Sequence, residues 1–323
     1  MKRFIGWIDP FTVFLLATVA LASLVPARGQ AVWWFETAAD CGIFLLFFLH
    51  GAKLSPAAIR AGALNWRLQG AVMLTTFALF PLLGWAFYQT SWLPAPLAMG
   101  ILFLTLLPST VQSSIAFTSM AGGNVAAAVC AASFSNIAAI AVTPALTHLM
   151  IADVGGPGVS AWASVRVIAL QLLLPFLLGQ LARPLLAAFL AKHKALVARV
   201  DRSSILLVVY TAFSAAVVAG LWNGISAGDL LLLALASILL LAIVLAVTWY
   251  AGRGMGLGYP DRVVLLFCGS KKSLASGVPI AGALFPAAQV GLTILPLMLF
   301  HQIQLIACAI IARRLAASQP LEV

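Results

Sequence analysis

The chain has 323 residues, of which 63% are apolar and only 8% are charged. This composition excludes a soluble globular domain, because a soluble fold needs far more polar surface to face water. The formal net charge of +10 does not indicate nucleic-acid binding, since the basic residues are scattered and not gathered with aromatic side chains on one surface.

Runs of about 20 apolar residues recur along the chain, and each is long enough to cross a hydrocarbon core of ~30 Å. The runs are continuously apolar, which favours helices over the alternating strands of a barrel. The sequence therefore predicts an all-α polytopic membrane protein. We expect ten transmembrane helices, at residues 8–26, 33–52, 67–88, 95–119, 124–151, 162–185, 203–222, 229–251, 262–284 and 289–312.

Lysine and arginine are distributed unequally between the two sides that these spans imply. One side collects fourteen basic residues: Lys2, Arg3, Lys53, Arg60, Arg67, Arg183, Lys192, Lys194, Arg199, Arg202, Arg253, Arg262, Arg313 and Arg314. The other side collects Arg28 and Arg166. Because cytoplasmic loops are enriched in basic residues, we expect both termini to lie in the cytoplasm.

The segment RPLLAAFLAKHKALVARVDR at residues 183–202 is the longest basic connection. We expect it to form a cytoplasmic loop that joins two halves of five spans each. Because five is odd, two consecutive halves cross the membrane in opposite orientations. That arrangement is an inverted repeat, a common framework of secondary transporters.

Small and polar residues interrupt the fourth expected span. Pro108 removes a backbone donor and bends or breaks a helix. Polar side chains follow it closely: Ser109, Thr110, Gln112, Ser113 and Ser114. These groups either satisfy the freed carbonyls of a kinked helix or coordinate a ligand, and the sequence leaves both interpretations open.

The ninth expected span carries two adjacent lysines, Lys271 and Lys272, with Ser270 and Ser273 on either side. A lysine at mid-bilayer costs about 2.5–3.5 kcal/mol. All eight carboxylates map to loops, termini or the end turns of spans, so we expect no protein counter-ion at the midplane. One interpretation is that the lysines extend to an interface. The other is an unwound helix, because adjacent residues of an intact helix point ~100° apart.

From the second interpretation we expect the two interrupted spans to cross, with both lysines at the crossing. Half-helix N-termini and ammonium groups there favour an anionic ligand. The four cysteines show no metal-ligand spacing, and we interpret them as buried, inert thiols. The sequence indicates no metal site and no cofactor.

Four stretches carry a resemblance to the bile acid:sodium symporter family, and most closely to its bacterial symporter-like branch. They are FFLHGAKLSP at 47–56, TFALFPLLGW at 76–85, LPSTVQSSIAFTSMAGGNVAAAVCAASFSN at 107–136 and LPLMLFHQIQLI at 295–306. The resemblance implies a multi-pass protein of the bacterial inner membrane, with substrate bound between a panel and a core domain. The implied segments are panel helices 1–2 at 1–60, core helices 3–5 at 61–155, panel helices 6–7 at 156–225 and core helices 8–10 at 226–323.

The resemblance also implies sodium sites, and these are only partly matched. The family's Ser-Asn pair in the fourth span falls on Ser113 and Ser114, and the third-span glutamine falls near Thr76. The fifth-span hydroxyl positions fall on alanines, although Ser133 and Asn136 lie close by.

The ninth-span glutamate and glutamine of the family fall on Phe267 and Lys271. The carboxylate of the sodium site is therefore missing, and a cation stands beside its place. We interpret this as loss of sodium coupling of the family type, with the amine of Lys271 or Lys272 in the space of the metal ion. Two adjacent ammonium groups repel each other in a low dielectric, so a proton is the alternative coupling ion to sodium.

The tenth span adds polar candidates, His301, Gln302 and Gln304. The leading hypothesis is a secondary transporter of an organic anion or amphipathic small molecule. A membrane enzyme would need paired carboxylates, a metal cluster or a nucleophile with a base, and the motifs for these are missing. A non-transporting regulator on a transporter scaffold stays open. The sequence indicates neither the substrate identity nor the oligomeric state.

Overall fold

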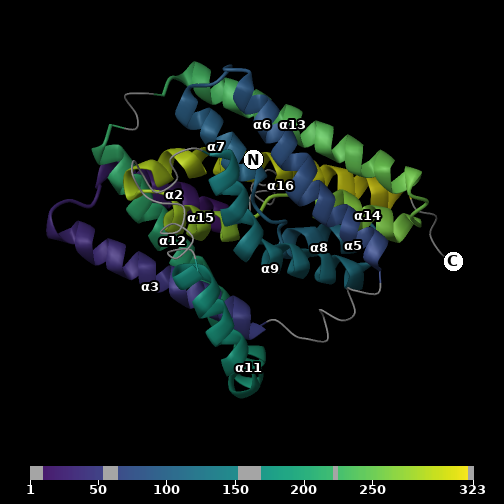
Figure 1. Ribbon diagram of the computed structural model, residues 1–323, viewed down its shortest axis with the longest axis horizontal. Coiled ribbons are helices and arrows are strands. Elements are labelled where there is room, and N and C mark those ends of the chain that lie inside the picture. Colours follow the sequence, from purple (N-terminus) through teal and green to yellow (C-terminus); the bar gives the residue numbers. More distant parts are fainter. Residues whose placement is uncertain (1–9, 54–64, 152–168, 221–224, 319–323) are drawn as a thin grey trace. The chain divides into compact units, whose positions relative to one another are not determined.

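The computed structural model describes residues 10–53, 65–151, 169–220 and 225–318, and every regular element in these ranges is a helix (Figure 1). The elements in chain order are α2 (Pro10–Leu24), α3 (Gln30–Lys53), α5 (Trp66–Leu74), the π-helix η1 (Thr75–Leu79), α6 (Phe80–Gln89), α7 (Ala95–Thr105), α8 (Gln112–Met120), α9 (Val125–Met150), the π-helix η2 (Ala169–Leu173), α11 (Leu174–Lys192), α12 (Lys194–Val218), α13 (Ala227–Gly254), α14 (Tyr259–Gly269), α15 (Leu274–Leu284) and α16 (Ala287–Ala317).

Within the described ranges, eight helical segments are long and apolar enough to cross a membrane. They are Gln30–Lys53, Trp66–Gln89, Val125–Met150, Leu174–Lys192, Lys194–Val218, Ala227–Gly254, Tyr259–Leu284 and Ala287–Ala317. Two shorter apolar helices, Val13–Leu24 and Ala95–Thr105, lie at the first and fourth expected spans. The chain is thus a multi-pass helical membrane protein, and the count of ten spans stays a prediction.

Some residues behind the orientation prediction lie outside the described ranges: Lys2, Arg3, Arg60 and Arg166. The start of the sixth expected span, at residues 162–168, lies outside them as well. The placement of both termini in the cytoplasm therefore stays a prediction.

The chain divides into two compact units. Unit 1 comprises Met1–Leu54, Thr147–Ala227 and Val278–Ile294, and unit 2 comprises Ser55–Leu146, Gly228–Gly277 and Leu295–Val323. The segment 226–323, expected as one part of a core domain, is thus divided between both units. The organisation into panel and core stays a prediction.

The expected basic loop at residues 183–202 is helical in the structure. Helix α11 runs to Lys192 and α12 begins at Lys194, with His193 between them. The segment is rich in leucine, alanine, lysine and arginine, which are strong helix formers. Its charged residues therefore belong to the adjoining ends of α11 and α12 and not to a loop. Lys53 at the end of α3 forms an ion pair with Asp201 on α12, at 2.5 Å.

In unit 1, α3 packs against both α11 and α12 (Figure 1). Two glycines allow the backbones of α3 and α11 to touch. A Cβ atom added to Gly51 would lie 2.0 Å from the carbonyl oxygen of Phe176, and one added to Gly179 would lie 2.0 Å from that of Phe48. Small residues serve the same purpose at other membrane helix contacts, where close backbone approach provides the van der Waals packing.

Gly179→Ala is expected to lower the free energy of unfolding by about 1–3 kcal/mol, the usual cost of overpacking. Gly70→Ala in α5 is the matched control, since an added Cβ there meets nothing within 4 Å. Alanine favours a helix over glycine by roughly 0.5–1 kcal/mol, so the control should be neutral or stabilising. Thermal unfolding of both variants in detergent checks this, and equal midpoints would refute a tight crossing of α3 and α11.

Candidate functional site

Two helical segments are interrupted within unit 2, and the interruptions touch. Helix α7 ends at Thr105 and α8 begins at Gln112, while α14 ends at Gly269 and α15 begins at Leu274. Across the gap, the backbone N–H of Ser273 donates to the carbonyl of Pro108 at 2.8 Å. Unwound backbone at membrane depth needs such partners, because lipid offers none.

The amine of Lys272 lies inside a cage of three backbone carbonyls. Its Nζ donates to the carbonyls of Thr76 at 2.8 Å, Thr105 at 2.7 Å and Leu107 at 2.7 Å. An ammonium group has three N–H donors, so every one of them is used. The ring of Phe80 lies 4.2 Å from Nζ, in the range of a cation–π contact. The side chain is fully buried.

The Thr76 carbonyl is available because of a π-helix and a proline. In η1 the N–H of Phe80 donates to the carbonyl of Thr75. The next residue is Pro81, which has no N–H to offer. The carbonyl of Thr76 therefore has no donor in its own helix and accepts from Lys272 instead. Single π-helical turns are frequent at functional sites.

The Thr105 carbonyl is available for a similar reason. Pro108 cannot donate to it, and the N–H of Ser109 is taken by the hydroxyl of Ser135 at 2.9 Å. Helix α7 therefore ends with carbonyls that lack intrahelical donors. The prolines at positions 81 and 108 thus free two of the three carbonyls that surround Lys272, those of Thr76 and Thr105.

The side chain of Gln304 on α16 forms a clamp of two hydrogen bonds with the backbone of Lys272. The N–H of Lys272 donates to Oε1 of Gln304 at 2.9 Å, and Nε2 of Gln304 donates to the carbonyl of Lys272 at 2.8 Å. Nε2 also donates to Nδ1 of His301 at 2.8 Å. Because Nδ1 must accept this bond, the ring carries its proton on Nε2. His301 is thus a hydrogen-bonded support of the clamp.

Gln304→Leu removes both clamp bonds and leaves a buried N–H and C=O of Lys272 without partners. We expect the free energy of unfolding to fall by about 2–6 kcal/mol, since each of the two unsatisfied buried groups costs about 1–3 kcal/mol. Gln289→Leu on the same helix, where the side chain is exposed, is the control and should change little. Thermal unfolding measures the difference, and similar midpoints would mean that the clamp is dispensable.

Lys271 has a different environment from Lys272, although it is equally buried. Its Nζ donates to the hydroxyl of Ser113 at 3.1 Å and lies 4.4 Å from the centroid of the Phe117 ring. The Ser113 hydroxyl donates to that of Thr110 at 2.9 Å. One hydroxyl and an aromatic face thus hold the amine, in a described region that supplies no carboxylate to it.

These contacts lie at the N-terminus of α8, where backbone N–H groups lack intrahelical acceptors. Gln112 at this end is exposed and Ser113 is half-buried. Thr110 also bonds Ser114 at 2.8 Å, and Ser114 donates to the carbonyl of Phe267 at 3.0 Å. A chain of hydroxyls therefore connects the start of α8 to the end of α14.

Asn136 on α9 ties the two interruptions together. Its Nδ2 donates to the carbonyl of Ser109 at 2.9 Å, and its Oδ1 accepts from the hydroxyl of Ser276 at 2.7 Å. Ser273 donates to Ser276 at 3.1 Å. The side chain predicted as a ligand is thus used in hydrogen bonds that join α9 to both broken segments.

The remaining expected site residues are placed as follows. The hydroxyl of Ser270 donates to the carbonyl of Leu266 one turn earlier, while Ser133 on α9 and Gln302 on α16 are half-buried. Thr76 contributes its carbonyl and not its hydroxyl, which is buried without a partner in the described structure. Sequence reasoning missed the carbonyls of Thr105 and Leu107. For Thr105 the available signal was Pro108, which cannot donate a hydrogen bond to it.

Comparison with known proteins gives a consistent result over nearly the whole chain. The model of the SBF-like CPA transporter family matches residues 9–317. The chain is 51% identical over 309 residues to "Putative symporter YfeH" of Escherichia coli (strain K12), covering 95% of this chain and 92% of that protein.

Two further relatives extend the comparison. The chain is 50% identical over 310 residues to "Uncharacterized protein PA2026" of Pseudomonas aeruginosa, covering 95% and 93% of the two chains. It is 24% identical over 316 residues to "Sodium/bile acid cotransporter 7" of Rattus norvegicus, covering 92% and 89%.

Proposed function

The chain belongs to the SBF-like CPA transporter family, and from this premise we propose that it moves an organic anion or amphipathic small molecule by alternating access. It is a membrane transporter and not an enzyme. Our proposal includes ten spans in two inverted repeats, crossed broken helices, and an inner-membrane location with cytoplasmic termini. The aligned relatives and the two helical interruptions within unit 2 support this arrangement.

The observation that carries the proposal is the carbonyl cage around Lys272. Three carbonyl oxygens within 2.8 Å of one Nζ form an environment suited to a cation. In this transporter the lysine amine is the resident cation, tethered to α14 and α15. We therefore propose that the amine replaces a coupling sodium ion, so that transport is proton-coupled or uncoupled.

The proposed anion contact is the amine of Lys271, a residue between α14 and α15 whose amine lies beside the N-terminus of α8. The amine has one hydrogen-bond acceptor, the hydroxyl of Ser113, and no carboxylate partner in the described chain. An anionic group there would gain a charge-assisted hydrogen bond from the amine and the favourable end of the α8 dipole. Apolar side chains beside the amine suit an amphipathic substrate.

Two alternatives stay in view because of particular observations. The rat relative is named as a sodium/bile acid cotransporter, which favours a sodium-coupled symporter with altered sites. The occupied cage at Lys272 favours a protein that no longer transports and acts as a regulator.

Uptake into proteoliposomes separates these functions. The purified protein is tested with labelled taurocholate, an aryl sulfate and pantothenate, under imposed sodium or pH gradients or with neither. We expect uptake of at least one anion that sodium does not stimulate. Uptake that requires a sodium gradient would establish the first alternative, and a folded protein that moves none of the anions would indicate the second.

A further inference from the structure

Three arginines of unit 2 meet where helix α13 ends and α14 begins. Arg253 lies in the last turn of α13 and Arg262 near the start of α14. The guanidinium of Arg67, at the start of α5, donates to the carbonyl of Met255 between the two helices at 2.8 Å. Helix α13 has 28 residues and is about 42 Å long, which exceeds a hydrocarbon core of ~30 Å. The arginines therefore lie at the level of the lipid headgroups.

The indole of Trp249 on α13 holds two of these guanidinium groups. Its ring centroid lies 5.3 Å from the guanidinium carbon of Arg253 and 5.4 Å from that of Arg262. The ring of Tyr259 lies 5.9 Å from the Arg262 guanidinium, and its hydroxyl donates to the carbonyl of Ala121 at 3.0 Å. Stacking on aromatic faces orders a guanidinium without using its N–H donors, so these donors stay available to a ligand.

The chain provides no counter-charge to this pair. No ion pair in the described ranges involves Arg253 or Arg262. The carboxylate next to them in sequence, that of Asp261, accepts from the amides of Asn65 at 3.0 Å and Asn124 at 2.9 Å, so both of its oxygens are engaged. The Nε of Arg262 is buried without a hydrogen-bond partner in the described structure. An unsatisfied donor on a charged group is costly, which favours an acceptor from outside the chain.

We propose that this arginine site, formed by Arg67, Arg253 and Arg262 around Trp249, binds the headgroup of an anionic phospholipid from the surrounding bilayer. The phosphodiester would accept charge-assisted hydrogen bonds from the guanidinium groups, whose planar fork matches phosphate oxygens. Basic pockets between transmembrane helices bind anionic headgroups in this way. The exposed apolar side chains of α13 would lie beside the acyl chains.

The usual enrichment of basic residues at span ends does not explain this arrangement. That enrichment requires only lysine or arginine near a span end. Here Gly252 on α13 also leaves room for the stem of Arg262, since an added Cβ would lie 3.1 Å from its Cγ. Arg253 stabilises a helix C-terminus, but Arg262 lies near a helix N-terminus, where a cation is unfavourable and an anion is favourable. An arginine seated there is better explained by a bound anion.

Lipid titration of the purified full-length protein tests the proposal. Native mass spectrometry in detergent measures binding of dioleoylphosphatidylglycerol and dioleoylphosphatidylcholine, which have the same acyl chains and differ in headgroup charge. We expect the anionic lipid to bind at least about 10-fold more tightly. Arg253→Gln and Arg262→Gln should each raise its dissociation constant about 10-fold or more and leave that of the other lipid unchanged. Arg253→Lys, which keeps the charge without the planar fork, should weaken binding less than Arg253→Gln.

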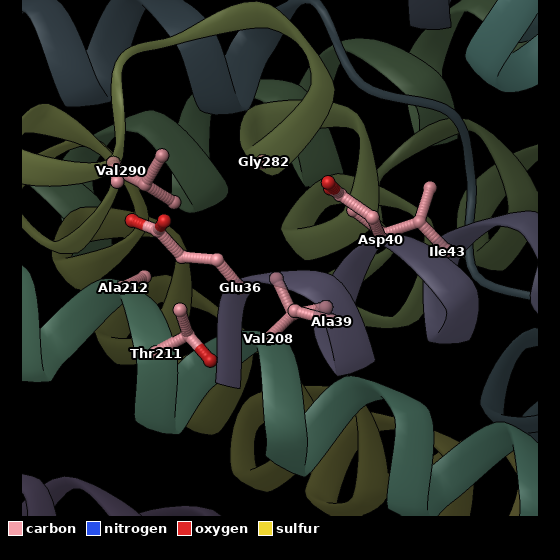
Figure 2. A pocket seen from close by; sticks show the side chains of 10 residues that line it. Glu36, Ala39, Asp40, Ile43, Val208, Thr211, Ala212, Gly282 and Val290 are labelled. Atoms are coloured by element: carbon pink, nitrogen blue, oxygen red, sulfur yellow. The ribbon is translucent and has the colours of Figure 1, made fainter. Parts of the chain in front are cut away.

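Two control variants separate the arginine site from general charge effects. Arg199→Gln removes an exposed arginine of α12 in unit 1, with the same change in net charge. Figure 2 shows a hollow of unit 1 into which Glu36 and Asp40 extend from α3, and Asp40→Asn removes a negative charge there. Both controls should bind phosphatidylglycerol like the wild type.

Three outcomes would overturn the proposal. The first is that phosphatidylglycerol and phosphatidylcholine bind alike. The second is that Arg199→Gln weakens binding of phosphatidylglycerol as much as Arg262→Gln does, which would show attraction by net charge alone. The third is that inorganic phosphate displaces phosphatidylglycerol at equal concentration, which would show a site for soluble anions and not for a lipid.

Discussion

Replacing Lys272 by methionine is expected to lower the free energy of unfolding by at least about 3 kcal/mol. The substitution keeps much of the side-chain volume but removes the donors to the carbonyls of Thr76, Thr105 and Leu107. Each buried carbonyl that loses its partner costs about 1–3 kcal/mol. Because these carbonyls belong to two separate helical segments, the contact between those segments is lost with the amine. Thermal unfolding in detergent measures the effect.

Lys271→Met is the matched control for this prediction. The neighbouring lysine is equally buried, has the same charge and lies in the same unwound segment, but it donates to one hydroxyl that keeps another partner in Thr110. Its loss should therefore lower the unfolding midpoint by less than half as much. If both substitutions shift the midpoint equally, removal of a buried charge explains the result and the carbonyl cage does not.

The fold class followed from composition, because runs of about 20 apolar residues leave few alternatives to membrane helices. Helix ends were harder to place. Residues 183–202 combine many charges with strong helix formers, and the charges suggested a loop where the structure has α11 and α12. Short-range patterns do not say whether a charged segment ends a helix or continues it beyond the apolar region.

The candidate site was predictable in its residue types but not in its contacts. The hydroxyls after Pro108 and the adjacent lysines indicated interrupted helices, and the structure has breaks at both places. The partners of Lys272 are main-chain carbonyls, however. Every residue has such a carbonyl, so residue type does not show which of them will bind the amine. Asp40 shows the same limit: it was expected near a helix end, whereas α3 begins at Gln30 and carries it further inside.

Lys271→Met is expected to reduce organic anion uptake in proteoliposomes about 10-fold to 100-fold. The amine is the proposed anion contact, and a hydrogen bond to a charged group contributes about 1.5–3 kcal/mol, which converts to that range of affinity. The loss should appear mainly as a higher KM, since the lysine side chain that is removed contacts the substrate and contributes little to the stability of the fold. Lys271→Arg, which keeps the charge, should recover part of the uptake.

Ser113→Ala separates the amine from the hydroxyl chain that positions it. Without its acceptor at 3.1 Å, the amine keeps its charge and its contact with the Phe117 ring, so uptake should fall less than in Lys271→Met. A merely structural role would instead lower the unfolding midpoint and the maximal rate together and leave KM unchanged. If Lys271→Met takes up the anion with the wild-type KM, the amine does not touch the substrate, and the N-terminus of α8 is not where the anion binds.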